Sequence, residues 1–306
     1  MAGGARYYPE FVLMLQEDGE PDVGYAAVGG LYVPSEAREL DAVERRVRAR
    51  AKTWPVGEVE RLSASQARTL FPPLHAEQPA LYVSGGARVD GRRLALALQR
   101  ACARHRARFE NGSAELIVHN HRAIGVRVAG QAIEAEVVVV AAGAWAPAML
   151  EPTGVRLAVV PQRGQILHLR QPGIDTAGWP VLMPLNSYYL LAFADSRVVV
   201  GATRETGSGF DYRVTAAGVA EVLSAGLAVA PGLASWTLEE IRIGFRPIAL
   251  DERPKLGPAP GIDNLIIGNG LGPSGLTMGP FCGSLLAQAA LGKAVDLARF
   301  AVVEHA

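Results

Sequence analysis

A glycine-rich turn near the end of the chain constrains the fold more than any other feature. Residues 270–275 read Gly-Leu-Gly-Pro-Ser-Gly, a G-x-G-x-x-G pattern between a predicted strand and a predicted helix. In a dinucleotide-binding unit, a second parallel strand ending in Asp or Glu follows about 20 residues later. Asp296 lies instead in a Lys-Ala-Val-Asp-Leu-Ala stretch of a 306-residue chain, so we do not expect a complete unit here. Three interpretations remain: a nucleotide site, a structural turn, or a glycine-lined loop with a helix N-terminus that faces a ligand.

Predicted helices and strands follow two patterns along the chain. The β-branched run Glu136–Ala141 is typical of a strand buried on both faces of a mixed or parallel sheet. The middle third alternates polar and apolar residues, as antiparallel strands do, over 164–169, 187–193 and 197–203. The sequence therefore predicts a mixed α/β fold with two interleaved domains. The first domain is assigned to residues 1–24, 81–158 and 246–306. The second domain, built on an antiparallel sheet, is assigned to residues 25–80 and 159–245.

Local signals predict several helices. Ser63 and Gln66 form a capping-box pattern, and Asp90 is a predicted N-cap for a helix over Gly91–Arg106. A further helix is expected over Phe281–Leu291, after the glycine-rich turn.

The composition excludes several functional classes. Thirty basic residues balance thirty acidic ones, which gives no basis for nucleic-acid binding. Cys102 and Cys282 are expected to be buried free thiols, and no Cys/His spacing suits a metal. The N-terminus lacks a secretion signal, and no apolar run approaches the roughly 20 residues of a membrane span. A soluble, cytoplasmic protein is expected.

Three other segments are candidate binding elements. After the buried run, Ala142-Gly143-Ala144-Trp145 either lets the backbone approach a flat ligand closely or makes a tight turn. Arg246, at the end of a predicted strand, either offers a bidentate fork to a carboxylate or forms a structural salt bridge. Tyr188 and Tyr189 on a strand either place one phenol in a cavity and one in the core, or simply pack in the core.

Five segments in this order resemble the flavin-dependent D-amino-acid oxidase and glycine oxidase family. The resemblance covers nearly the whole chain, and it is carried by the segments 137–145, 161–165, 199–203, 244–247 and 264–276. It implies a non-covalent FAD and oxidative deamination of an amine or amino acid by hydride transfer to the flavin. It also implies that the first domain above binds FAD and that the second binds substrate.

The resemblance implies a role for each candidate residue. Arg246 would bind the substrate carboxylate, and Tyr189 would line the substrate cavity. Backbone amides at a helix N-terminus would face the flavin, where positive potential favours negative charge on the ring. The residues assigned to FAD are Glu115, Ala142, Gly143, Trp145, Leu271, Gly272, Pro273, Ser274, Gly275, Leu276 and Thr277.

Two departures from the family pattern affect these expectations. The loop carries Leu271 and Pro273 where relatives have histidine and a second substrate-binding arginine, so another amino acid or a secondary amine is as well supported as glycine. No G-x-G-x-x-G unit for the ADP half of FAD occurs at the front of the chain. That unit is expected to be missing because the sequence is truncated, because a partner chain supplies it, or because this is a short homologue without flavin.

Two functions therefore remain open from the sequence. The first is an FAD-dependent amine or amino-acid oxidoreductase, either a homo-oligomer or paired with a chain that holds ADP. The second is a non-catalytic protein that binds small carboxylates or takes part in assembly. The intact loop at 271–277 favours the enzyme.

Overall fold

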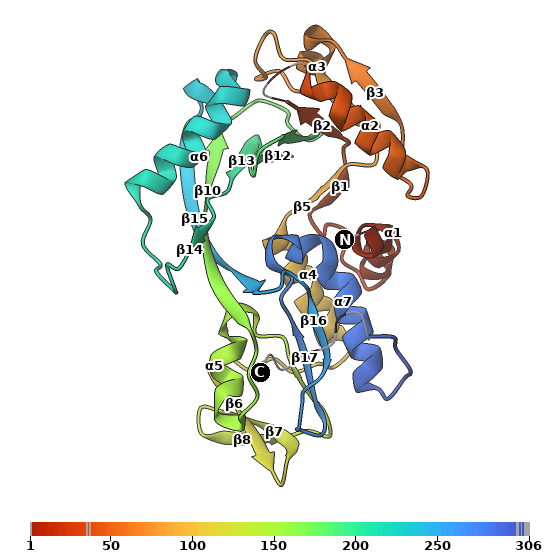
Figure 1. Cartoon of the computed structure of the whole chain (residues 1–306), viewed down its shortest axis with the longest axis vertical. Helices are drawn as coiled ribbons and strands as arrows, with labels where there is room; N and C mark the ends of the chain where they lie inside the picture. The colour runs from red at the N-terminus through yellow and green to blue at the C-terminus, as the bar shows by residue number, and fades with distance from the viewer. Residues whose placement is uncertain (1, 35, 37, 298–299, 301, 303–306) are drawn as a thin grey trace.

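Long antiparallel strands dominate the fold. The computed structural model describes residues 2–34, 36, 38–297, 300 and 302. Within these residues, a nine-stranded sheet occupies the upper part of the molecule (Figure 1). Its strands are β2 (Gly30–Val33), β3 (Val59–Leu62), β4 (Ala80–Val83), β10 (Val159–Arg170), β11 (Val181–Pro184), β12 (Tyr189–Phe193), β13 (Arg197–Gly201), β14 (Glu205–Thr206) and β15 (Thr237–Ala249).

Strands β10 and β15 pair along almost their whole length and run from the upper sheet into the lower part of the molecule (Figure 1). Their register places Gly164 opposite Gly244 and Ile166 opposite Arg242. Because paired residues in antiparallel strands point to the same face, one face of this ribbon carries residues 162, 164, 166 and 168 with 240, 242, 244 and 246. That face lines the main cavity.

The opposite face of the sheet packs against helices. Leu167 and Val200 lie in a buried cluster with Val222 of α6 (Ala216–Val229). Two glycines bring α6 close to the sheet, because a Cβ at Gly218 or Gly226 would collide with Gln165 or Val200. The helix α3 (Ala64–Leu70) and the 3₁₀ turn η3 (Pro231–Ser235) join this core, whereas α2 (Glu39–Ala51) packs against β4 in a separate cluster.

A second sheet holds the segments on either side of the glycine-rich turn. In it, β17 (Leu265–Asn269) pairs in parallel with β9 (Val138–Val140) and antiparallel with β16 (Lys255–Pro258). The expectation that 136–141 is buried on both faces is wrong, since only three residues are in the strand and Val139 is 39% exposed. Within the described chain β9 pairs only with β17, so it is an edge strand.

Helix α7 (Gly275–Ala290) begins six residues before the predicted helix. Its first turns pack closely on α1 (Ala2–Glu17), where a Cβ on Gly4 would collide with the carbonyl oxygen of Thr277. The Tyr8 hydroxyl of α1 also donates to the Leu276 carbonyl. Tertiary packing therefore stabilises a helix start that its glycines and Pro280 disfavour.

The remaining elements complete a mixed α/β fold, as predicted. Cys282 is buried as expected, but Cys102 is exposed because it lies on the outer side of α4.

The division into two domains remains a prediction, and residues 303–306 of its last segment lie outside the described residues. The remaining elements are β1 (Tyr25–Ala27), β5 (Ala87–Val89), α4 (Gly91–Arg104), β6 (Ala114–His119), β7 (Arg122–Val128), β8 (Gln131–Glu134), η1 (Gly143–Trp145), α5 (Ala146–Leu150), η2 (Glu151–Thr153) and η4 (Gly272–Ser274).

Candidate functional site

A cavity of about 600 Å³ lies over the β10–β15 ribbon. Its walls come from β10, β12, β13 and β15, from the start of α4, and from the turn that opens α7. The cavity therefore brings together residues that are far apart in the sequence, including Tyr189, Arg246 and Gly275.

Arg246 has the environment of an anion-binding side chain. Its guanidinium lies over Gly164, where an added Cβ would be 2.6 Å from Nη2. Its Nη1 donates to the Thr203 carbonyl at 3.0 Å and to Gln162 Oε1 at 3.3 Å. No described carboxylate forms an ion pair with it, and burial lowers its pKa. A structural salt bridge is thus not its role within the described chain, and its charge is available to a ligand.

Tyr189 is the first residue of β12, and Tyr188 directly precedes it, so their side chains point to opposite sides of the chain. Tyr189 lines the cavity with its hydroxyl over Gly201, and burial raises its pKa. Tyr188 packs against the main core and donates to Glu221 Oε1. Tyr189 therefore faces the cavity, whereas Tyr188 is partly buried at the edge of the core.

The loop after β17 lies at the other side of the cavity from β12. Gly272, Pro273, Gly275 and Leu276 line it, while Leu271 and Ser274 line an adjoining cavity of about 470 Å³ that Gly272 and Pro273 share. Thr277 is exposed in the first turn of α7. Backbone N–H groups at this helix N-terminus give the shared wall a positive potential.

The remaining predicted FAD residues lie outside the lining of these two cavities. Asn269 Nδ2 donates to the Gly143 carbonyl at 2.8 Å, which ties the end of β9, and with it Ala142, to the end of β17. Gly143 has φ +54° and open space around an added Cβ. Trp145 stacks on Phe210 at 5.0 Å, and Glu115 is exposed on β6 in the separate β6–β7–β8 sheet.

Sequence analysis missed a polar cluster at the far end of the main cavity. His168 is 1% exposed, and its Nδ1 lies 3.0 Å from Arg197 Nη1. Arg197 also pairs with Asp90 at 2.9 Å and Asp195 at 3.1 Å, and Arg242 pairs with Glu240 at 2.6 Å. Their spacing along the strands was the one signal available in the sequence. His168 lies an even number of residues from Gly164, and Arg242 from Arg246, and such residues share one face of a strand.

Burial and the neighbouring Arg242 and Arg197 lower the pKa of His168 from 6.5 to about 4. The unfolded chain therefore takes up this proton first as the pH falls, and the contribution of neutral His168 to stability is lost between about pH 6.5 and pH 4. We expect the urea midpoint of the wild type to fall more steeply over this range than that of His168→Gln. The exposed residue His119 provides the control: His119→Gln should keep the wild-type slope. Equal slopes for wild type and His168→Gln would contradict the prediction.

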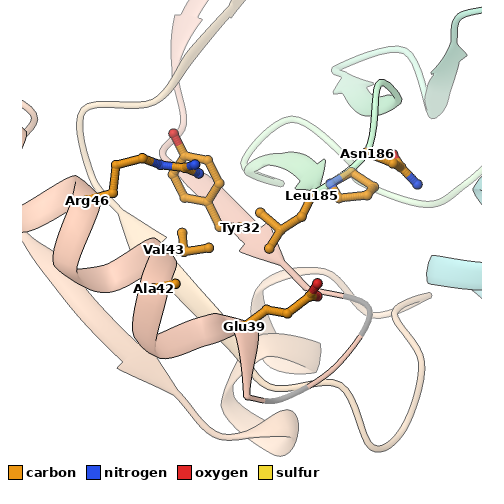
Figure 2. Close-up of a pocket in the computed structure, with 8 residues that line it drawn as sticks. Tyr32, Glu39, Ala42, Val43, Arg46, Leu185 and Asn186 are labelled. Carbon is orange, nitrogen blue, oxygen red and sulfur yellow. The ribbon is translucent and has the colours of Figure 1, made fainter.

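A third cavity, of about 490 Å³, lies between α2 and the segment after β11 (Figure 2). Glu39 and Arg46 lie at its two ends, and Tyr32 and Leu185 stand between them (Figure 2). It contains none of the predicted site residues. The described part of the chain also holds no cluster of His, Cys, Asp or Glu suited to a metal, and none of its helices is long and apolar enough to cross a membrane.

Comparisons with known proteins show which family the chain resembles. The uncharacterised oxidoreductase YurR of Bacillus subtilis is 43% identical over 297 residues, which cover 96% of this chain and 80% of YurR. The crystal structure of iminodiacetate oxidase from Chelativorans sp. BNC1 matches with a TM-score of 0.95 and 50% identity, over 98% of this chain and 82% of that one. Glycine oxidase from Geobacillus kaustophilus matches with a TM-score of 0.84 and 26% identity, over 99% and 82%. The family model for FAD dependent oxidoreductases of the DAO type matches residues 3–289, and this chain therefore belongs to the DAO family of FAD-dependent oxidoreductases.

Proposed function

We propose that this protein oxidises the C–N bond of a small amine that carries a carboxylate. The observation that carries the proposal is Arg246, a partly buried guanidinium without a carboxylate partner among the described residues, in a cavity that also reaches the N-terminus of α7. The names of the two relatives, glycine oxidase and iminodiacetate oxidase, point to the same substrate class.

The loop residues fit the ring end of FAD. Gly272 and Gly275 leave the backbone of the turn uncovered on the cavity side, and no described atom lies within 4 Å of an added Cβ at Gly275. The N–H groups of this turn would favour the negative charge that the reduced ring carries. We assign Leu271 to Thr277 to this end of the cofactor, with Ala142, Gly143 and Trp145 beside it. Glu115 is proposed for the adenine end.

When bound, FAD would accept the hydride, which carries both electrons, from the substrate carbon. Arg246 would hold the carboxylate in a fixed orientation, so that the carbon bearing the amine faces the loop. Tyr189 would close the other side of the cavity and keep water from the reacting carbon. The imine formed by loss of the hydride and the amine proton is hydrolysed by water to a carbonyl compound and the free amine or ammonia.

The first test is a titration of the purified chain with FAD, followed by visible absorption and by anaerobic addition of amino acids. We expect a bound-flavin spectrum that bleaches with a carboxylate-bearing amine but not with the same amine lacking the carboxylate. A protein that binds FAD but is bleached by no amine would overturn the proposal. A chain that does not take up FAD alone but does so with a co-purifying partner would support the prediction that the ADP-binding unit is supplied from outside.

Tyr189→Phe tests the role given to the phenol. Removing one hydroxyl while keeping the ring should raise KM about tenfold or less, because a single neutral hydrogen bond contributes roughly 1 kcal/mol. Steady-state kinetics would check this, with Tyr188→Phe as the matched variant on the other face of β12, which should leave KM unchanged. Complete loss of activity in Tyr189→Phe would give the hydroxyl a role in the chemical step instead.

A further inference from the structure

Within the described chain, a single nitrogen holds the guanidinium of Arg246. Nη1 donates to the Thr203 carbonyl at 3.0 Å and to Gln162 Oε1 at 3.3 Å. Nε and Nη2 make no hydrogen bond to the described residues, and unlike Arg242 Nε they are not sealed from solvent. Because a guanidinium is planar and rigid, fixing Nη1 also fixes the direction of the other N–H groups. The acceptors of Nη1 therefore decide how Arg246 meets a carboxylate.

The Thr203 carbonyl is available to Arg246 because β13 ends before it. This strand stops at Gly201, and residues 202–204 lie outside any strand. Thr203 is nevertheless attached to Gln165 of β10 at two points. Its backbone N–H donates to the Gln165 carbonyl at 3.2 Å, and its hydroxyl accepts from the Gln165 N–H at 2.9 Å. Both residues are fully buried, so the carbonyl that binds Arg246 is fixed to β10.

Glu205 completes the hydrogen bonding of the Thr203 hydroxyl. That hydroxyl donates to Glu205 Oε1 at 2.6 Å. The same carboxylate accepts from Gln165 Nε2 at 2.8 Å and from Arg163 Nε at 2.9 Å. Burial would raise the pKa of Glu205, but these hydrogen bonds outweigh burial and lower the pKa, so the group is ionised at neutral pH. A charged acceptor holds a hydroxyl more strongly than a neutral one does.

We propose that Thr203 and Glu205 are positioning residues for the substrate carboxylate, because they fix the carbonyl that orients Arg246. Neither residue is among the described residues that line the main cavity or the adjoining one, so they act without contacting the substrate. The inference rests on the proposed function, since it takes Arg246 as the residue that binds the carboxylate. A tilted guanidinium loses part of a bidentate contact, and a misplacement of about 1 Å can cost up to about a hundredfold.

The test measures carboxylate binding without turnover. (Methylthio)acetate carries one carboxylate and no amine, so it cannot be oxidised as an amine. An NMR titration of the purified protein, with and without added FAD, gives its dissociation constant. Thr203→Val keeps the size of the side chain but removes the hydroxyl, and we expect it to bind (methylthio)acetate about tenfold more weakly. Glu205→Gln should weaken binding about threefold, because a neutral acceptor replaces a charged one.

Two controls separate positioning from a general loss of stability. Thr203→Ser restores the hydroxyl and should bind (methylthio)acetate within about twofold of the wild type. Thr176→Val removes a hydroxyl from another fully buried threonine, where it donates to the Phe193 carbonyl. This variant should have a lower urea midpoint than the wild type and an unchanged dissociation constant.

A double-mutant cycle tests whether Thr203 acts through Arg246. With a carboxylate-bearing amine as substrate, Thr203→Val should lower kcat/KM about tenfold through KM and leave kcat within about twofold of the wild type. Added to Arg246→Met, the same substitution should lower kcat/KM by less than about twofold, because the side chain that it positions is absent.

Three outcomes separate the two proposals. Wild-type affinity for (methylthio)acetate in Thr203→Val, or a full tenfold loss of kcat/KM when it is added to Arg246→Met, would overturn the positioning role even if an amine bleaches the flavin. Weaker binding by Thr203→Val in a protein whose flavin no amine reduces would support the positioning role and overturn the proposed reaction. Equal binding by the wild type and Arg246→Met would overturn both.

Discussion

Replacing Arg246 with methionine is expected to lower kcat/KM for a carboxylate-bearing amine by about a hundredfold or more. A bidentate, charge-assisted contact in a desolvated cavity contributes several times as much as an exposed ion pair, and truncating one partner leaves the other charge unpaired. Most of the loss should appear in KM, since the carboxylate is held in the ground state as well as during hydride transfer. Steady-state kinetics with added FAD would measure both parameters.

Two further variants refine this result. Arg127→Met removes an exposed arginine from β7 and should leave the kinetics unchanged. Gly164→Ala keeps the positive charge of Arg246 but places a Cβ 2.6–2.8 Å from its guanidinium. Because this contact would displace the guanidinium, the variant should also have a higher KM. Wild-type kinetics in Arg246→Met would remove this residue from the site.

Replacing Arg197 with methionine is expected to destabilise the fold by about 3 kcal/mol or more, because it leaves a buried carboxylate without its cation. Asp90 caps α4 and is 8% exposed, and Arg197 binds it at 2.9 Å. Burial alone would raise the pKa of Asp90, but the hydrogen bonds from Arg197 and the helix N-terminus outweigh burial and lower it. The same substitution removes the donor to His168 Nδ1.

Urea unfolding would measure this loss of stability. Arg170→Met provides the comparison, since its ion pairs with Asp195 and Glu239 are partly exposed and should each contribute less than about 1 kcal/mol. Asp90→Asn removes the buried carboxylate itself, so no carboxylate is left without its cation. We expect this variant to be more stable than Arg197→Met. Equal midpoints for wild type and Arg197→Met would show that solvent reaches Asp90.

Features encoded in neighbouring residues were predictable from the sequence. The Ser63 capping box and the Asp90 cap are present as expected, because each depends on bonds between residues two or three positions apart. Arg246 was selected by its place at the end of a predicted strand and Tyr189 by its place on another. The resemblance selected both, and the structure brings them to one cavity.

Features that depend on distant residues were not predictable in the same way. His168 and Arg242 meet only because β10 pairs with β15 in one register, and a shift of one residue would turn either side chain to the opposite face. The early start of α7 depends on packing against α1, at the other end of the sequence. Trp145 was assigned to the cofactor from the resemblance, and its stacking on Phe210 could not be predicted because Phe210 lies in a loop some 65 positions away.

The pairing of β10 with β15 has a consequence for how substrate length could change in this family. Side chains that face the cavity recur every second residue, which corresponds to about 6.6 Å along the strand. Residues 242, 244 and 246 have their side chains on the same face of β15, so an arginine moved along this face would shift by two residues at a time. Because cavity-facing positions are spaced by two residues, the preferred substrate length would change in steps of about 6.6 Å. The length and conformation of the side chain would allow only smaller adjustments.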